Sequence, residues 1–150
     1  MEGGENMNKK GFTLIELLVV IAIIGLLSTL AVVALGQARV KARDSKRLSD
    51  LKQLQTALEL YYTDNNAYPA GSGVVMGATG YKCLTSSGFA DTCASGTTYM
   101  GQVPTDPSTG QSYTYTAGTG NTSYSIAAAL EGTVNGLTTG ITVSPSGIAD

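Results

Sequence analysis

The sequence contains no histidine and only two cysteines among its 150 residues. A Ser-His-Asp triad, a Cys-His dyad and a histidine-ligated metal centre are therefore excluded, since each of them requires an imidazole. The chain also lacks a glycine-rich phosphate-binding loop that ends in lysine. We therefore expect a protein that is not an enzyme and that carries no cofactor.

Basic residues are almost absent from the second part of the chain. Of the nine lysines and arginines, only Lys82 lies beyond Lys52, whereas six acidic residues lie there. This excess of negative charge would repel nucleic acid and anionic lipid. We expect no contact with nucleic acid in this part of the chain.

Charge is also absent from residues 17–35, which form an aliphatic run interrupted only by Gly25, Ser28 and Thr29. At about 1.5 Å per residue, a helix of this length nearly matches a bilayer core of roughly 30 Å. The buried helix of a soluble protein is disfavoured, because the polar, glycine-rich remainder could not cover it on all sides. A cleaved secretory signal is disfavoured because its apolar region is shorter. The run predicts a membrane-spanning helix.

The orientation of this helix receives conflicting signals. Five basic residues follow it closely, which by the positive-inside rule would place the C-terminal part in the cytoplasm. The acidic, loop-rich composition after Lys52 and its cysteine pair are typical of exported domains. We expect the C-terminal part to be exported.

Glu16 stands inside the N-terminal apolar stretch FTLIELLVV. A carboxylate at the centre of a membrane-spanning helix costs about 2.5 to 3.5 kcal/mol, so an ionisable residue there is a functional candidate. The alternative is a carboxylate near the helix end that reaches the lipid headgroups.

The stretch KKGFTLIELLVVIAIIGLL, residues 9–27, resembles the leader and N-terminal segment of type IV pilins and type II secretion pseudopilins. The resemblance implies that a prepilin peptidase cuts after Gly11 and that the new first residue, Phe12, is N-methylated. Glu16 and Gly25 then match the family's glutamate and glycine at the fifth and fourteenth mature positions. Residues 1–11 would be the leader, with Met7 as an alternative start to Met1.

The same resemblance implies a structural subunit of a type IV pilus-like filament. Glu16 would pair with the terminal amine of Phe12 in a neighbouring subunit and set the axial register, because two charges in a filament core are tolerable only as a pair. Implied partners are further copies of the chain, prepilin peptidase, inner-membrane assembly machinery and, before assembly, the bilayer. The subunit would be a single-pass membrane protein that later joins an extracellular or cell-surface filament.

Two other functions remain open at this stage. One is the major pseudopilin of a type II secretion system, which is a filament subunit of the same construction. The other is an uncleaved, membrane-anchored surface protein or adhesin, which would retain its leader.

The apolar run continues into an amphipathic pattern in which Leu48, Leu51, Leu54 and Leu58 recur at helical spacing. We expect one helix from about Phe12 to Tyr62, with a membrane and polymerisation part over residues 12–35 and an amphipathic part with its turn over residues 36–68. Turn-forming residues and Pro69 would end it. Many pilins have a proline where this chain has Val33, so local melting between Gly25 and Gly36 in a filament is an open question.

The basic residues 39–47 suggest two interpretations. Arginine and lysine can hold DNA phosphates, as in DNA uptake. We favour contacts with lipid headgroups or with acidic residues of adjacent subunits.

Residues 69–150 predict a β-rich head. Three alternating segments, QSYTYTA, SYSIAAAL and GITVSPSG, predict a three-stranded antiparallel sheet packed against the helix. The fold class is therefore α+β. A preceding loop, residues 71–101, contains Cys83 and Cys93, which we expect to form a disulfide in an exported protein. A free pair or a metal site is the alternative.

Residues 103–115, VPTDPSTGQSYTY, are similar to a Pro-Asp-Pro, Gly and Tyr-x-Tyr run of major pseudopilins, some of which bind calcium nearby. Asp106 is therefore a weak candidate ligand. We favour a turn role for Asp106, because the head has few carboxylates for a calcium site.

Overall fold

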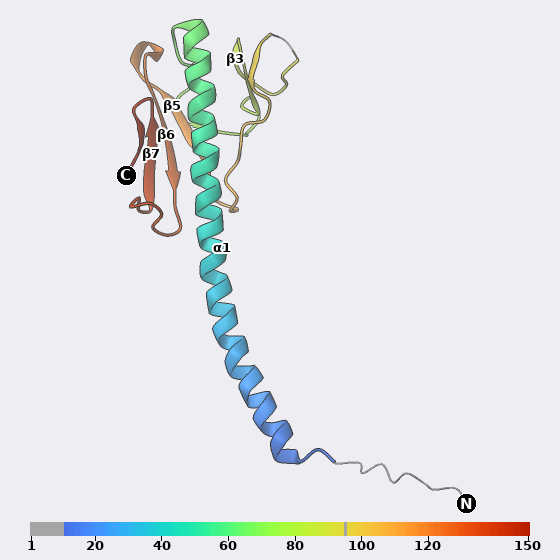
Figure 1. The fold of residues 1–150 in the computed structure, drawn as a ribbon. Helices are drawn as coiled ribbons and strands as arrows, with labels where there is room; N and C mark the ends of the chain where they lie inside the picture. Colours follow the sequence, from blue (N-terminus) through green and yellow to red (C-terminus); the bar gives the residue numbers. More distant parts are fainter. Residues whose placement is uncertain (1–10, 95) are drawn as a thin grey trace, which may run out of the picture. The chain divides into compact units, whose positions relative to one another are not determined.

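The computed structural model describes residues 11–94 and 96–150 and divides the chain into two compact units. One unit ends at Ala38 and the other extends from Arg39 to Asp150. Helix α1, Leu14–Asn65, contributes to both (Figure 1). Of the expected leader, residues 1–10 lie outside the described residues, and the expected domain boundaries stay predictions.

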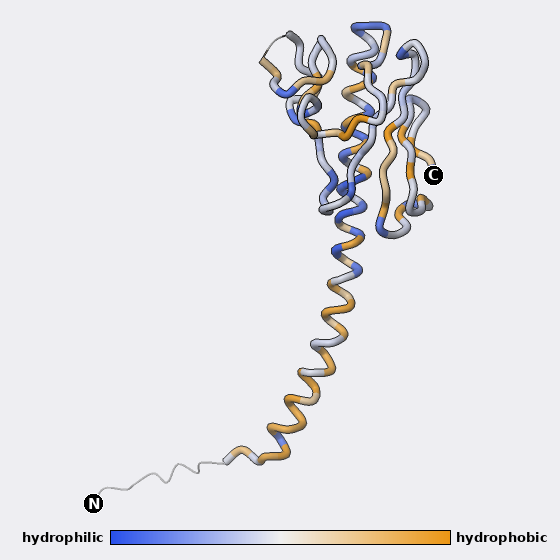
Figure 2. Tube along the Cα trace, turned by 180° about the vertical axis from the view of Figure 1, so that it is seen from behind, coloured by the Kyte–Doolittle hydropathy of each residue, from blue (hydrophilic) through white to orange (hydrophobic). Residues whose placement is uncertain are grey.

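The first unit consists of the N-terminal part of α1, whose side chains are exposed throughout. Figure 2 shows that this part is predominantly hydrophobic. Its two hydroxyl side chains bond to the helix itself, since Ser28 donates to the carbonyl oxygen of Ile24 at 2.7 Å and Thr29 to that of Leu26 at 2.8 Å. The polar groups are thus satisfied internally, as a lipid environment requires.

The helix ends three residues beyond the expected Tyr62 and begins two residues after the expected Phe12. Its end is set by Asn66, which has a left-handed backbone with φ of 53° and whose N–H donates to the carbonyl oxygen of Tyr62 at 2.8 Å. Asparagine adopts this conformation at low cost, which makes it a common residue just past a helix end. Pro69 then prevents continuation.

The second unit contains a five-stranded antiparallel sheet in the order β1-β5-β6-β7-β8. The three predicted segments form β5, β6 and β7, so the predicted sheet is confirmed and two edge strands were missed. The segment GITVSPSG contains the first strand and the turn of a hairpin. The chain turns back after Ser144, and the next strand, β8, pairs with β7. The strands are β1 (Val74–Val75), β5 (Thr114–Ala117), β6 (Tyr124–Ala129), β7 (Gly140–Ser144) and β8 (Gly147–Ala149), and a short 3₁₀ helix, η1 (Thr119–Asn121), precedes β6.

A second sheet occupies the region that was expected to be a loop, so that expectation is wrong for residues 71–101. The order is β3-β2-β4, with β2 at Cys83–Thr85, β3 at Gly88–Ala90 and β4 at Thr98–Met100. The strands are only three residues long, which is why their alternation is hard to detect in the sequence. The disulfide between Cys83 and Cys93 is present, with 6.1 Å between the Cα atoms, and confirms the predicted pair.

The core of the second unit joins the leucine stripe of α1 to the larger sheet. Successive side chains of a strand point to opposite faces, so alternate residues of β5, β6 and β7 point inward. In Figure 1, β6 and β7 lie on one side of α1 and β3 lies on the other. The α+β fold is therefore confirmed. The helix contributes Leu51, Leu54, Ala57 and Leu58, and the three central strands contribute Tyr115, Tyr124, Ile126, Ala128, Ile141 and Val143.

We predict that Leu58→Ala destabilises the head by about 2 to 5 kcal/mol, since it leaves a cavity in a packed core. Leu58 is 0% exposed, whereas Leu60 is 52% exposed on the same helix. Leu60→Ala is the matched control and should change the free energy of unfolding by less than about 0.5 kcal/mol. Urea unfolding followed by the near-ultraviolet circular dichroism of the tyrosines measures both. Equal losses in the two variants would contradict this core.

Candidate functional site

The described residues just before α1 have no regular secondary structure and are exposed. A Cβ atom placed on Gly11 would meet no atom within 4 Å. The described fold therefore gives no reason for a glycine at this position. A requirement for glycine here would come from outside the described residues.

The start of α1 is closed by a reciprocal pair of hydrogen bonds between Thr13 and Glu16. The Thr13 backbone N–H donates to Glu16 Oε2 at 2.9 Å, and the Glu16 N–H donates to Thr13 Oγ1 at 3.3 Å. The Thr13 hydroxyl also donates to Oε2, at 2.7 Å. This is a capping box, which satisfies two of the backbone donors left open at a helix start.

The capping box gives Glu16 a role within its own chain that the sequence analysis missed. Its signature, Thr-x-x-Glu, is present at positions 13–16. Only Oε2 of Glu16 takes part in hydrogen bonds within the described residues. The other oxygen, Oε1, is left to accept from a second partner.

The apolar segment, residues 12–35, has no cover within the described residues. Among those residues, α1 is the helix that is long and apolar enough to cross a membrane. Its large side chains are 45 to 81% exposed from Phe12 to Leu35. Such a continuous apolar surface marks contact with lipid or with protein.

A buried guanidinium forms the second notable site, in the part of α1 that belongs to the head. The side chain of Arg47 is 0% exposed. Its Nε and Nη2 atoms each donate to one oxygen of Asp106 at 2.8 Å, and Nη1 donates to Asp44 Oδ1 at 2.7 Å. Nη1 also lies 2.8 Å from Glu131 Oε1. We call Asp44, Arg47, Asp106 and Glu131 the Arg47 cluster.

The Arg47 cluster connects α1 to two distant loops. Asp44 accepts hydrogen bonds from the backbone N–H groups of Glu131 and Gly132, both at 2.9 Å, and so holds the turn after β6. Glu131 also accepts from Arg43. Bidentate pairing of arginine with a carboxylate adds geometric specificity to the attraction. The cluster therefore fixes how both loops sit on the helix.

The charges of the cluster shift one another's titration. Hydrogen bonds from Arg43 and then Arg47 hold the pKa of the Glu131 carboxyl well below its ordinary value. Burial opposes ionisation of Asp106, but Arg47 and the Ser108 backbone N–H outweigh it, so the pKa of Asp106 is also lowered. Pairing with Asp106, and with Glu131 and Asp44, raises the pKa of Arg47. All the partners that shift are therefore ionised at neutral pH.

These contacts correct the expectations for Arg43 and Arg47, two of the basic residues 39–47, whereas Arg39 and Lys41 are exposed and the expectation for them stays a prediction. Arg47 is buried and bound within its own chain, so it is available neither to DNA phosphates nor to lipid headgroups or adjacent subunits. Arg43 is paired with Glu131. Sequence analysis missed this because Arg47 and Asp106 are 59 residues apart, although the leucine stripe places Arg47 on the helix face that the head covers.

Asp106 has the expected turn role, because its side chain accepts from the backbone N–H two residues further on, and it also belongs to the Arg47 cluster. Both of its carboxylate oxygens accept hydrogen bonds from Arg47, and Oδ1 also accepts from the Ser108 N–H at 2.8 Å. The residues that the structure describes include no group of three or more His, Cys, Asp or Glu arranged to hold a metal ion. The donor set at Asp106 is thus occupied by a guanidinium.

Comparison with known families confirms the resemblance to pilin-like proteins. Residues 6–32 match the prokaryotic N-terminal methylation motif, and residues 34–138 match the family described as type II secretion system (T2SS), protein G. The second match covers well over half of the chain. The chain belongs to the type II secretion system protein G family.

The alignments with the individual relatives named here cover less than half of this chain. Type II secretion system core protein G of Pectobacterium carotovorum subsp. carotovorum is 43% identical over 68 residues, which cover 45% of this chain and 44% of the relative. The protein of the same name from Escherichia coli (strain K12) is 46% identical over 61 residues, or 41% of this chain and 42% of the relative.

A pilus protein is also among the relatives. Type IV wide pilus major component PilA4 of Thermus thermophilus is 41% identical over 69 residues, or 46% of this chain and 53% of the relative. The chain thus spans about half of the length of the relatives it matches. No solved structure matches the chain.

We predict that Arg47→Met costs about 3 to 5 kcal/mol at neutral pH, because it leaves three carboxylates without their buried counter-charge. Arg39→Met, at an exposed arginine of the same helix, is the control and should cost less than about 0.5 kcal/mol. The free energy of unfolding is measured for the full chain in detergent micelles. Equal stability of the Arg47 variant and the wild type would contradict the role of the cluster.

We predict that the free energy of unfolding depends on pH with opposite sign in the wild type and in Arg47→Met. In the wild type the pKa values of the Asp106 and Glu131 carboxyl groups are lowered on folding, so the stabilisation from these two groups is complete above about pH 4 to 5 and is lost as the pH falls through the folded values. In Arg47→Met the crowded carboxylates repel one another, and protonation relieves the repulsion. The stability difference between the proteins should therefore shrink from about pH 7 to about pH 4.

Proposed function

We propose that the chain is a structural subunit of a pilus-like filament, made as a membrane-anchored precursor and polymerised through the N-terminal part of α1. The observation that carries the proposal is the apolar segment, which has a carboxylate at its start and no cover within the described residues. Lipid covers such a surface before assembly, and the same segments of other subunits cover it in a helical bundle. The proposal assigns the chain no catalytic activity.

Glu16 supports polymerisation over simple anchoring. An anchor needs only apolar surface, and its capping box would work equally well with glutamine at position 16. A charge at this position gains a modest stabilisation from the helix dipole, and it gains more if a cation meets it in an apolar surrounding. Oε1 of Glu16 is directed to no group within the described residues, so it is available to the terminal amine of Phe12 in an adjacent subunit.

The proposed precursor is cut after Gly11 and methylated on Phe12 by prepilin peptidase. Support comes from the methylation-motif match and from the exposure of Gly11, which nothing in the described fold requires to be glycine. A residue without a side chain allows the peptidase to approach the backbone closely. Residues 1–11 are then the leader.

Among filaments, the match over residues 34–138 favours the major pseudopilin of a type II secretion system. The pilus alternative is supported by the Thermus relative. Deletion of the gene in the native host separates them: a pseudopilin is needed for export of secreted proteins, whereas a pilin is needed for surface pili.

The proposed location of the head is outside the cytoplasm. A disulfide persists in an oxidising compartment, and the acidic composition after Lys52 agrees with export. The proposed partners are further copies of the chain, the peptidase and inner-membrane assembly machinery. Nucleic acid is not among them, since Arg43 and Arg47 are paired internally. The engaged oxygens of Asp106 favour a head without calcium at that residue.

We predict that the protein isolated from its native host begins at Phe12 and carries one added methyl group. Intact mass and N-terminal sequencing measure this directly. Gly11→Leu should retain the leader, whereas Gly25→Leu, at an equally uncrowded glycine, should be processed normally. An unprocessed wild-type chain would favour the anchored surface protein and contradict the filament.

A second prediction separates the two roles of Glu16. Glu16→Gln keeps the capping box and removes the charge, whereas Thr13→Ala removes the cap at a cost of about 1 kcal/mol and keeps the charge. Processed Glu16→Gln subunits should fail to enter sheared filaments, and Thr13→Ala subunits should still assemble. Normal assembly of Glu16→Gln would exclude the charge pairing. If only Thr13→Ala subunits failed to assemble, the role of Glu16 would be limited to capping its own helix.

A further inference from the structure

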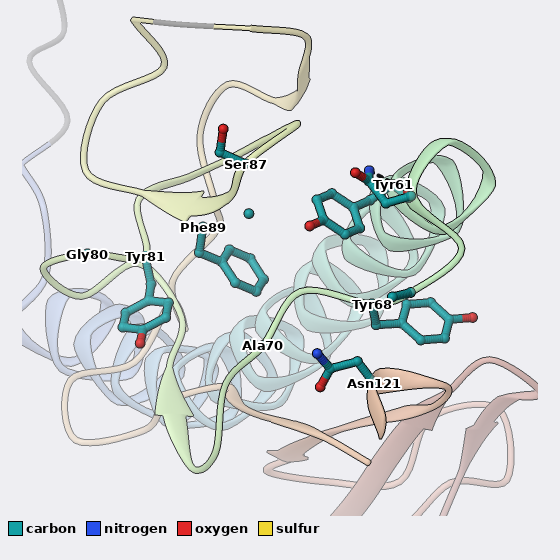
Figure 3. A pocket seen from close by; sticks show the side chains of 11 residues that line it. Tyr61, Tyr68, Ala70, Gly80, Tyr81, Ser87, Phe89 and Asn121 are labelled. Atoms are coloured by element: carbon teal, nitrogen blue, oxygen red, sulfur yellow. Dashed lines mark hydrogen bonds between the residues drawn. The ribbon is translucent and has the colours of Figure 1, made fainter. Parts of the chain in front are cut away.

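A cavity of about 490 Å³ lies between the end of α1 and the β2–β3 hairpin (Figure 3). Its size falls within the range of small-molecule sites, about 300 to 1,000 Å³. All of its lining residues belong to the second unit, Arg39–Asp150. The functional proposal above makes no use of it.

The walls of this cavity are aromatic and are held from behind by further rings. Phe89 contacts the fully buried Tyr115 edge-on at 5.3 Å between ring centroids. Tyr61 is braced in the same way by Tyr99 at 5.6 Å, and Tyr68 by a buried ring of β6 at 4.7 Å. Rings that are fixed before binding lose little conformational freedom when a ligand arrives. The cavity is therefore preorganised to accept a flat apolar face.

Polar groups without partners converge on the same space. In Figure 3 the Tyr61 hydroxyl and the Asn121 side-chain amide point into the space beside the Phe89 ring, whereas the Tyr68 hydroxyl points away. Tyr68 donates to Glu59 at 3.0 Å, but the Tyr61 hydroxyl and the Asn121 amide bond to no group in the part of the chain that the structure describes. These groups can both donate and accept hydrogen bonds.

Asn65 adds an acceptor. Its amide nitrogen already donates to the carbonyl oxygen of Tyr61 at 2.9 Å, so its Oδ1 atom remains to accept a hydrogen bond. A ligand that carries donors as well as acceptors can therefore use all of these groups. A proline-rich peptide, which offers carbonyl oxygens and few N–H groups, fits this requirement poorly.

The lining carries no charge. The described residues that line the cavity include no Lys, Arg, Asp or Glu, and the nearby carboxylates of Glu59 and Asp91 are engaged by Tyr68 and by the Gly80 N–H. A charged ligand would lose its hydration there without gaining a counter-charge. The uncharged lining, the aromatic walls and the mixed hydrogen-bonding groups thus define a neutral ligand with an apolar face and a rim of hydroxyls.

We infer that this cavity binds a ring of an uncharged pyranose sugar. The axial C–H groups of a β-glucoside form a flat apolar face that stacks on Phe89 and Tyr61. Its equatorial hydroxyls reach the amides of Asn121 and Asn65. The inference does not depend on polymerisation, since every group that it uses lies in the second unit of one chain.

The test is a binding titration of the full chain in dodecylphosphocholine micelles, a detergent without a sugar headgroup. Methyl β-D-glucopyranoside is the probe, and methyl β-D-glucuronide is the charged comparator with the same ring. Ligand-observed saturation transfer and the shifts of tyrosine ring signals report binding. The neutral glucoside should bind saturably and more tightly than the glucuronide.

Two variants locate the site. Phe89→Leu should weaken binding about tenfold through loss of the stacking surface. Asn121→Gly should weaken it about fivefold, the equivalent of one hydrogen bond. Glycine keeps the left-handed backbone of Asn121, φ 55°, and the carbonyl that accepts from the Tyr68 N–H.

Asn135→Gly is the matched control, because Asn135 has nearly the same backbone, φ 53°, and does not line the cavity. It should leave the affinity unchanged. Absence of saturable binding, equal affinity for the glucuronide, or equal affinity of Asn121→Gly and the wild type would overturn the inference. Tighter binding of a proline-rich peptide than of the glucoside would also overturn it.

Discussion

One buried guanidinium joins parts of the head that are far apart in the sequence. Arg47 reaches Asp106 across 59 residues, and its neighbour Asp44 holds the turn that begins at Glu131. A buried ion pair of this kind is costly to desolvate, and apolar residues of the same volume often stabilise a fold as well. Its contribution is orientation. Apolar packing alone lets a helix slide on a sheet, whereas directed hydrogen bonds to Arg47 fix one position.

This constraint matters because the leucine stripe by itself is nearly uniform. Leu51, Leu54 and Leu58 offer similar side chains one turn apart, and the sheet offers alternating tyrosine, isoleucine and valine. The disulfide restrains the smaller sheet in a comparable way, because it ties β2 to the segment that follows β3, and the strands of this sheet are only three residues long. The head is therefore a set of short elements, each tied to its neighbours by a specific polar or covalent contact.

Local patterns predicted α1, its end to within three residues and the three central strands, because each depends on residues close together in the chain. The capping box of Thr13 and Glu16 was equally local and could have been recognised from its spacing. The Arg47 cluster could not, since its partners meet only after the head has folded. The second sheet was missed because strands such as β3 are too short to show a period, and the sequence suggests a loop wherever Gly, Ser and Thr accumulate.

The capping box has an electrostatic consequence for processing. In an uncut chain Phe12 is part of a neutral peptide, and the positive charges nearest in sequence to the cap are the side chains of Lys9 and Lys10. A cut before Phe12 removes both lysines and places a full positive charge on the backbone next to the cap, where it adds to the positive end of the helix dipole. Proteolysis would thus move positive charge from side chains of the leader to the first backbone atom of the helical segment, where the carboxylate of a neighbour can meet it.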